Sequence, residues 1–184
     1  MRAASRPRLL FILRHAKAVT DPPRGGGDHE RELAPRGRRD ARALGRRLGP
    51  KGDHFGLDDA DLPTVVLCST AARTLQTAER VLDGMAGEID LRPLRVLYRA
   101  DPDDVLAQIR MVEDDVHSVM VVGHNPTAAQ LVVEAAAPAP LEGGSVEQHG
   151  LPTCALTVVA LPAASWADAA FGTAEWARMF APPY

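Results

Sequence analysis

Cysteine is scarce in this chain, and long apolar runs are absent. The 184 residues include two cysteines, Cys68 and Cys154, both in apolar stretches without metal-binding spacing. This excludes a disulfide-stapled fold and indicates two reduced, buried thiols. No segment approaches the ~20 apolar residues of a membrane-spanning helix. The apolar run behind the basic N-terminus is also too short for a signal peptide. We therefore expect a soluble, cytoplasmic protein with no membrane partner.

An excess of charge of one sign is also missing. The formal net charge is −3, with 21 Lys and Arg against 24 Asp and Glu. This balance predicts no nucleic-acid partner, so any attraction for an anion must be local. A hydrophobic share of 46% and a charged share of 24% are typical of a globular protein. The length suits a single domain over residues 1–184, with residues 1–8 flexible.

Aliphatic runs without polar alternation are present, and they predict strands buried on both faces. Four are clear and one is weaker: Leu9–Leu13, Val65–Cys68, Val119–Val122 and Ala155–Ala160, with the weaker run around Leu94–Leu97. Residues 174–180 fit either a short helix or a closing edge strand.

Helical patterns occupy the stretches between these runs. Pro35–Leu48 begins with proline and carries an apolar stripe, and a second helix follows Ser69, which we expect as its N-cap. Asp101 opens a third helix, and Asn125 and Pro126 open a fourth as cap and first helical residue. The alternation predicts an α/β fold, a three-layer α/β/α sandwich around a mainly parallel sheet.

Positively charged and imidazole side chains follow three of the predicted strands. The first strand ends in Arg14-His15, Arg73 lies just beyond the second, and His124 follows the run Val119–Val122. The carboxyl ends of parallel strands share one edge of a sheet, where ligands bind. Two guanidiniums, two imidazoles and the N-terminus of the fourth helix would meet there and favour a phosphate. Singly, each residue is more often a solvated arginine or a structural histidine; together on one edge they indicate a site.

Four stretches resemble a known family in order and spacing. "LRHAKA", "DHERELAPRG", "STAARTLQTAE" and "VVGHNP" resemble motifs of the histidine phosphatase superfamily, which is phosphoglycerate mutase-like, and in particular of its SixA-type phosphohistidine phosphatases. The resemblance runs from about Leu9 to Ala160. It implies the phosphoglycerate mutase-like form of the sandwich and a phosphatase that needs neither a metal nor a cofactor.

The resemblance also implies roles for individual residues. His15 would be the nucleophile that forms a phosphohistidine intermediate, which water then hydrolyses. Arg14, Arg73 and His124 would complete the catalytic set by binding the phosphoryl oxygens and stabilising their charge. Asn125 would join these three in binding substrate. The implied partner is a phosphorylated protein or a small phosphorylated molecule.

This sequence departs from the family pattern at two places. Ala34 stands where the group usually has threonine, which removes a helix cap worth ~1 kcal/mol. Tyr98, Arg99 and Ala100 stand where larger members carry a carboxylate that protonates an alkoxide leaving group. Without that acid, cleavage of a P–N bond is favoured over a P–O bond, although Asp28 or Asp101 could reach the site.

The spacing of the motifs leaves little room for a lid. Between Arg73 and His124 the chain holds one predicted strand and one predicted helix besides turns. We therefore expect an open pocket that suits a phosphate on a protein surface.

Several alternatives remain. "CSTAART" resembles the Cys-x5-Arg loop of cysteine phosphatases, but it is one residue short and lacks glycine. A metal site could combine His15, His29 and His124, without any i,i+4 spacing. A small-molecule phosphoester phosphatase, a mutase and a non-catalytic phosphate-binding module are also consistent with the motifs.

Overall fold

A single mixed sheet organises the computed structural model, which describes residues 6–146 and 150–184. Over these residues the sheet has seven strands in the order β3-β2-β4-β1-β6-β7-β5. Their bounds are β1 Arg8–Arg14, β2 Val65–Ser69, β3 Asp90–Leu94, β4 Ser118–Gly123, β5 Leu141–Glu142, β6 Leu156–Leu161 and β7 Trp176–Phe180. The run β3-β2-β4-β1 is parallel, whereas β6 is antiparallel to both β1 and β7. The prediction of a mainly parallel sheet is confirmed.

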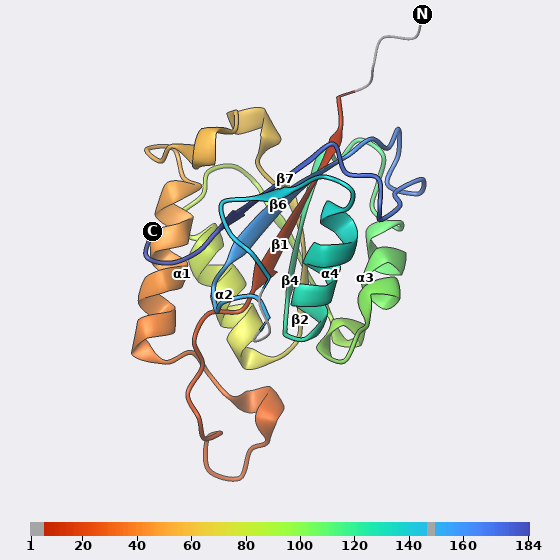
Figure 1. Cartoon of the computed structure of the whole chain (residues 1–184). Helices are drawn as coiled ribbons and strands as arrows, with labels where there is room; N and C mark the ends of the chain where they lie inside the picture. Colours follow the sequence, from red (N-terminus) through yellow and green to blue (C-terminus); the bar gives the residue numbers. More distant parts are fainter. Residues whose placement is uncertain (1–5, 147–149) are drawn as a thin grey trace, which may run out of the picture.

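Helices cover both faces of the sheet (Figure 1). α1 and α2 pack on one face and α3 and α4 on the other, and four short 3-10 turns lie in the connections. Their bounds are α1 Pro35–Arg47, α2 Ala72–Leu82, α3 Pro102–Ile109, α4 Thr127–Ala136, η1 Asp28–Glu30, η2 His54–Gly56, η3 Asp59–Asp61 and η4 Arg95–Tyr98. The three-layer α/β/α sandwich is therefore confirmed. None of the helices in the described ranges has the length and apolar character to cross a membrane.

The central strand β1 divides the core in two. Leu10 and Ile12 face the cluster under α3 and α4, whereas Leu9, Phe11 and Leu13 face the cluster under α1 and α2. Alternate side chains of a strand point to opposite faces, so a strand covered on both sides must be apolar throughout. This explains the unbroken aliphatic run that ends at the site.

The fifth predicted strand is wrong in position. The strand is β3, over residues 90–94, and the chain turns into η4 at Arg95. β3 pairs only with β2, in a register that runs from Val65 opposite Asp90 to Ser69 opposite Leu94. Since β2 ends at Ser69, it offers no paired residue beyond Leu94, and the chain leaves the sheet there.

The structure decides two further questions at the ends of the chain. Residues 174–180 contain β7, a strand and not a helix, and the two-residue β5 pairs along its outer side. Residues 1–5 of the predicted flexible segment 1–8 lie outside the described residues. Arg8, by contrast, is buried in β1 and donates to the carbonyl oxygens of Asp114 (2.9 Å) and Ala164 (2.7 Å), so at this residue the prediction is wrong.

Two of the predicted helix caps are wrong and one is confirmed. Ser69 ends β2, and Ala71 precedes α2 without a side-chain cap. Asn125 does not cap α4, because Pro126 holds that position and the Asn125 amide donates to the Leu151 carbonyl at 3.1 Å. Asp101 does cap α3, accepting a hydrogen bond from the Asp104 backbone at 2.8 Å.

Candidate active site

Two histidines meet where β1 and β4 end. These strands pair in parallel with Arg14 opposite Gly123, so His15 and His124 leave the sheet side by side. The His15 backbone N–H donates to the Gly123 carbonyl at 3.0 Å. The centroids of the two imidazole rings are 5.2 Å apart. The parallel pairing thus brings together residues that are 109 positions apart in the sequence.

The His15 ring is held in one tautomer. Its Nδ1 lies 2.8 Å from the carbonyl oxygen of Ala16. A carbonyl can only accept, so Nδ1 carries the proton and Nε2 keeps its lone pair. The Ala16 N–H in turn donates to Thr77 Oγ1 of α2 at 3.0 Å, which anchors the segment behind the ring. An imidazole with an unprotonated, oriented Nε2 has the lone pair that a nucleophile requires.

Burial keeps this ring neutral. Burial is the largest of several effects that together lower the pKa of His15 from 6.5 to about 4; the Ala16 carbonyl raises the pKa, and the guanidiniums of Arg73 and Arg14 lower it. Desolvation and neighbouring positive charge both disfavour the imidazolium form. At neutral pH the His15 ring therefore has a lone pair available for attack.

A proton NMR titration of the ring C–H signals tests this pKa. We expect His15 to titrate near pH 4, and added inorganic phosphate to raise the midpoint because an anion favours the imidazolium. The unfolded chain, with its histidine pKa near 6.5, takes up the proton first, so His15 lowers folding stability progressively as pH falls from 6.5 to about 4. The spectrum of His15→Asn identifies the signal, and a midpoint near 6.5 would contradict the expectation.

His124 is held from the neighbouring strand. Its Nε2 lies 2.8 Å from the hydroxyl of Ser69, the last residue of β2. Burial lowers the pKa of His124 to about 3, with His15 and Arg73 adding to the effect. Its Nδ1 is buried and has no hydrogen-bond partner among the described residues. Ser69, predicted as a helix cap, is thus a positioning residue for this ring.

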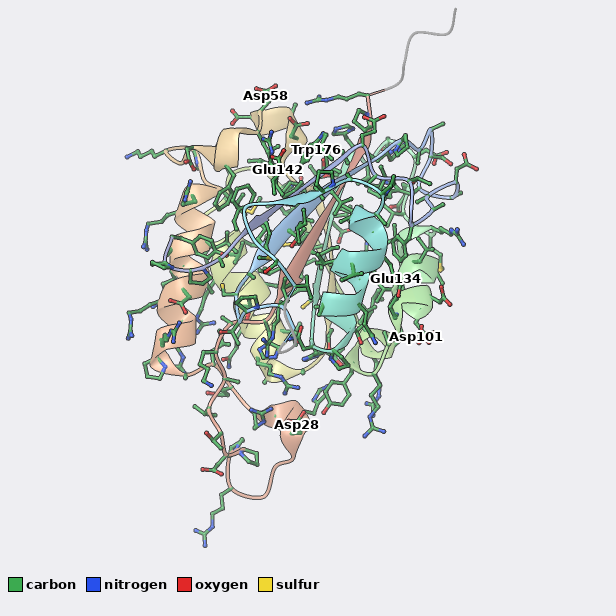
Figure 2. The ribbon with its side chains drawn as sticks, viewed as in Figure 1. Asp28, Asp58, Asp101, Glu134, Glu142 and Trp176 are labelled. Carbon is green, nitrogen blue, oxygen red and sulfur yellow. The ribbon has the colours of Figure 1, made fainter. Side chains whose placement is uncertain are left out.

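Arg73 is buried in the first turn of α2 and is tied to the loop before α1. It is 5% exposed and donates to Asp28 twice, to the backbone carbonyl at 2.7 Å and to Oδ2 at 2.9 Å. The Asp28 carboxylate also accepts from Tyr98 (2.8 Å) and from Arg31 (2.9 and 2.6 Å). These hydrogen bonds, that of Tyr98 first, hold the pKa of Asp28 far below its usual range. Asp28 is an ionised clamp on the arginine, and Figure 2 shows it at the same end of the molecule as the start of α3.

A cavity of about 400 Å³ lies among these groups. Its lining consists of Arg14, His15, Lys17, Ala18, Asp28, Arg31, Arg73, His124, Asn125 and Thr153. Three guanidiniums and one ammonium face a single carboxylate, so the cavity is locally positive in a chain whose net charge is −3. Such a cavity favours an anion with several acceptor oxygens. We call it the phosphate cavity.

The structure brings together all five residues that the sequence singled out. Arg14, His15, Arg73, His124 and Asn125 line the phosphate cavity. Sequence reasoning missed that Lys17, Arg31 and Thr153 line it too. The signal for Arg31 was present in the sequence, because Arg31 lies in "DHERELAPRG", one of the stretches that resemble the family. The resemblance was noted without a role for this arginine.

One predicted contribution is wrong. The N-terminus of α4 does not line the phosphate cavity. Pro126 has no N–H to offer, and the Ala128 N–H already donates to the His124 carbonyl at 2.7 Å. Among the residues that line the cavity, the positive charge is carried by the side chains of Arg14, Lys17, Arg31 and Arg73.

Cys68 cannot serve as the nucleophile of a cysteine phosphatase. Its thiol is fully buried, donates to the Ser69 carbonyl at 3.3 Å, and has its pKa raised by burial to about 12. For the metal alternative, His29 Nε2 lies 3.0 Å from the hydroxyl of Thr70. Within residues 6–146 and 150–184, no three His, Cys, Asp or Glu side chains are arranged to hold a metal ion.

Comparison with known proteins places these features in a family. The family model of the histidine phosphatase superfamily (branch 1) matches residues 10–94. An uncharacterized protein of Mycobacterium tuberculosis is 37% identical over 167 residues, which cover 88% of this chain and 94% of that protein.

Two solved structures are similar over almost the whole chain. One, from Nakamurella multipartitia, is assigned as phosphohistidine phosphatase SixA; it has a TM-score of 0.75 and 29% identity, covering 99% of this chain and 100% of the other. The other is the protein histidine phosphatase SixA complexed with tungstate, with a TM-score of 0.67 and 25% identity over 92% of this chain and 95% of that one.

Proposed function

Since the chain belongs to the histidine phosphatase superfamily and is of the SixA type, we propose that it removes phosphoryl groups from phosphorylated proteins through a phosphohistidine intermediate on His15. The observation that carries this proposal is the tautomer of His15. Its Nδ1 donates to the Ala16 carbonyl, which leaves the Nε2 lone pair available beside a cluster of cations.

Two displacements at phosphorus make up the reaction. His15 Nε2 attacks the phosphorus, a P–N bond forms, and the leaving group departs with the electron pair of the broken bond. Water then attacks the same phosphorus, and its oxygen stays in the inorganic phosphate. The electron pair of the P–N bond returns to His15. The hydrogen bond from Nδ1 to Ala16 stabilises the ring while it carries the phosphoryl group.

Hydrogen-bond donors that the fold holds in place stabilise the negative charge of the phosphoryl oxygens in the transition state. The guanidiniums of Arg14 and Arg73 lie on the phosphate cavity, and each carries a buried Nε that has no partner among the described residues. In the proposed arrangement Ser69 donates its hydroxyl proton to His124 Nε2, so the proton of that ring lies on Nδ1, where it can bind a phosphoryl oxygen. Preorganised donors of this kind supply much of the rate enhancement in phosphoryl transfer.

The carboxylates near the site are poor general acids. Asp28 is held ionised by Tyr98 and its two arginine partners. Asp101 is engaged at the N-terminus of α3, where it accepts from the Asp104 N–H. An alkoxide leaves badly without a proton, whereas the imidazole of a phosphohistidine leaves more readily. These contacts support P–N cleavage as the preferred reaction.

The surroundings of the cavity support a protein-borne phosphate. The chain from Arg73 to His124 contains the rest of α2, then β3, η4, α3 and β4, and no inserted lid lies among these residues, all of which the structure describes. A phosphorylated side chain on a partner protein can therefore approach the rim formed by the loop of residues 20–32.

A substrate comparison in the presence of a chelator tests the proposal. We expect release from a phosphohistidine protein and from p-nitrophenyl phosphate without added metal. Release from a sugar phosphate should be slower than from the phosphohistidine protein by about 10²-fold or more, which is the contribution of a general acid. Faster release from the sugar phosphate would favour a small-molecule phosphatase or mutase. Phosphate binding without release from any substrate would favour a binding module.

A further inference from the structure

A second cavity of about 350 Å³ lies beside the phosphate cavity. It opens between α3 and α4, on the opposite face of the sheet from α1 and α2. Its floor is apolar and comes from both the sheet and the helices: Ile12, Leu97, Val105, Val121, Ala128 and Leu131. A smaller aliphatic cavity of about 150 Å³ suffices to bind benzene in another protein, so this one has room for a larger flat ring system.

The two cavities share a wall. His124 and Asn125 line both of them, whereas His15 lines only the phosphate cavity. An in-line displacement sends the leaving group away from the nucleophile. The leaving group must therefore depart on a side of the phosphate that His15 does not line, and the second cavity meets this condition because it is lined by His124 and Asn125 but not by His15.

Asn125 presents an acceptor at this boundary. Its amide nitrogen donates to the Leu151 carbonyl, while its Oδ1 is buried without a partner among the described residues. A lone acceptor does not favour a phosphoryl oxygen, which is also an acceptor, but it suits an N–H or O–H on the leaving group. Asn125 thus lies between the two cavities and offers an acceptor that suits the leaving group better than the phosphate.

The mouth of the second cavity is preformed by three hydrogen bonds. Thr127 Oγ1 of α4 donates to the Ala100 carbonyl at 2.6 Å and joins the two sides of the opening. Asp101 is fixed as the cap of α3, and Tyr98 is fixed by Asp28 at 2.8 Å. Because these side chains are already held in place, few of them need to be ordered when a ligand binds, and the entropic cost of binding is lower.

We propose that this cavity, named here the leaving-group cavity, binds the flat apolar ring of the group from which phosphate is removed. The proposal rests on the proposed function and specifies its substrate class. A phosphorylated imidazole would lie with its ring over the aliphatic floor and its ring N–H toward Asn125 Oδ1, whereas an aryl group would use the aliphatic floor alone. On cleavage, the ring nitrogen of the imidazole or the phenolic oxygen of the aryl group keeps the electron pair of its bond to phosphorus and then takes a proton from solvent.

Phenyl phosphate and 2-naphthyl phosphate test the proposal as substrates, because their leaving groups have similar basicity and differ in apolar area. We expect kcat/KM of the wild type to favour the naphthyl ester by roughly tenfold, from the extra apolar area buried. Ala128→Leu, which fills the cavity, should abolish this preference. It should leave competitive inhibition by inorganic phosphate within about twofold, because Ala128 does not line the phosphate cavity.

Two further variants keep the test decisive. Ala135→Leu places the same volume in a buried position of α4 that lines neither cavity, so it should keep the naphthyl preference. Leu131→Ala enlarges the leaving-group cavity and should increase the preference, which provides a result even if Ala128→Leu fails to fold. An unchanged preference in both Ala128→Leu and Leu131→Ala, with phosphate release intact, would overturn this proposal alone. No release from either ester would overturn this proposal, and no release from the esters or from a phosphohistidine protein would overturn the proposed function as well.

Discussion

Replacement of His15 by alanine is expected to lower kcat for phosphate release by about 10⁴-fold or more. The proposed reaction forms its P–N bond at Nε2 of His15. The other candidates in the phosphate cavity are engaged, because His124 Nε2 contacts Ser69 and the Asp28 carboxylate accepts from Arg31, Arg73 and Tyr98. Steady-state kinetics with p-nitrophenyl phosphate measures the effect.

Binding should survive the same change. Arg14, Arg73 and His124 remain in His15→Ala, so calorimetry should detect inorganic phosphate with an affinity close to that of the wild type. The wild type should also yield an acid-labile phosphoenzyme that the variant lacks. His117→Ala is the matched control, because His117 precedes β4 at the opposite end of that strand from His124. Retention of more than a tenth of the activity in His15→Ala would mean that the nucleophile is another group.

Replacement of Arg73 by lysine is expected to lower kcat/KM by about 10²–10³-fold. Lysine keeps the charge but loses the planar fork that holds both the Asp28 carbonyl and its carboxylate, and it loses the Nε–H that has no partner among the described residues. The buried site also leaves a shorter ammonium poorly satisfied. Kinetics with p-nitrophenyl phosphate and calorimetric titration with inorganic phosphate together measure the loss.

Arg80→Lys gives the corresponding control. Arg80 lies on the same helix, donates to the Gln76 carbonyl at 3.0 Å, and lines neither of the two cavities. Its replacement should leave kcat/KM within about twofold. Equal losses in the two variants would show that α2 is merely sensitive to substitution, and would remove the argument for a role of Arg73 in phosphate binding.

Strands buried on both faces were the most predictable part of the fold. The runs that became β1, β2, β4 and β6 are predominantly apolar, because both of their faces are covered. The ends of these strands could also be predicted, because polar residues begin where the covered part of the strand stops. In a strand such as β1, with six buried residues before Arg14, a sudden change to Arg14-His15 marks the sheet edge. The local sequence pattern therefore predicted both these strands and the site residues at their ends.

Pairings between distant segments could not be predicted. The start of β3 depends on the register that β2 imposes, and its own residues, which include Arg92 and Pro93, do not look like a buried strand. Ser69 and Asn125 have the composition of helix caps, yet their side chains are used by His124 and Leu151. A hydroxyl or an amide is satisfied equally well by a nearby backbone group or by a distant partner, and only the fold decides between them.

Sequence alone thus determined that strand ends carry arginines and histidines, because residue type and local periodicity are properties of the chain itself. The tertiary structure decided the rest. It set Asp28 against Arg73 across 45 positions, placed Ser69 behind His124, and opened an apolar cavity beside the phosphate cavity. These features depend on which strands become neighbours, and that choice follows from the burial of the whole core and not from any one segment.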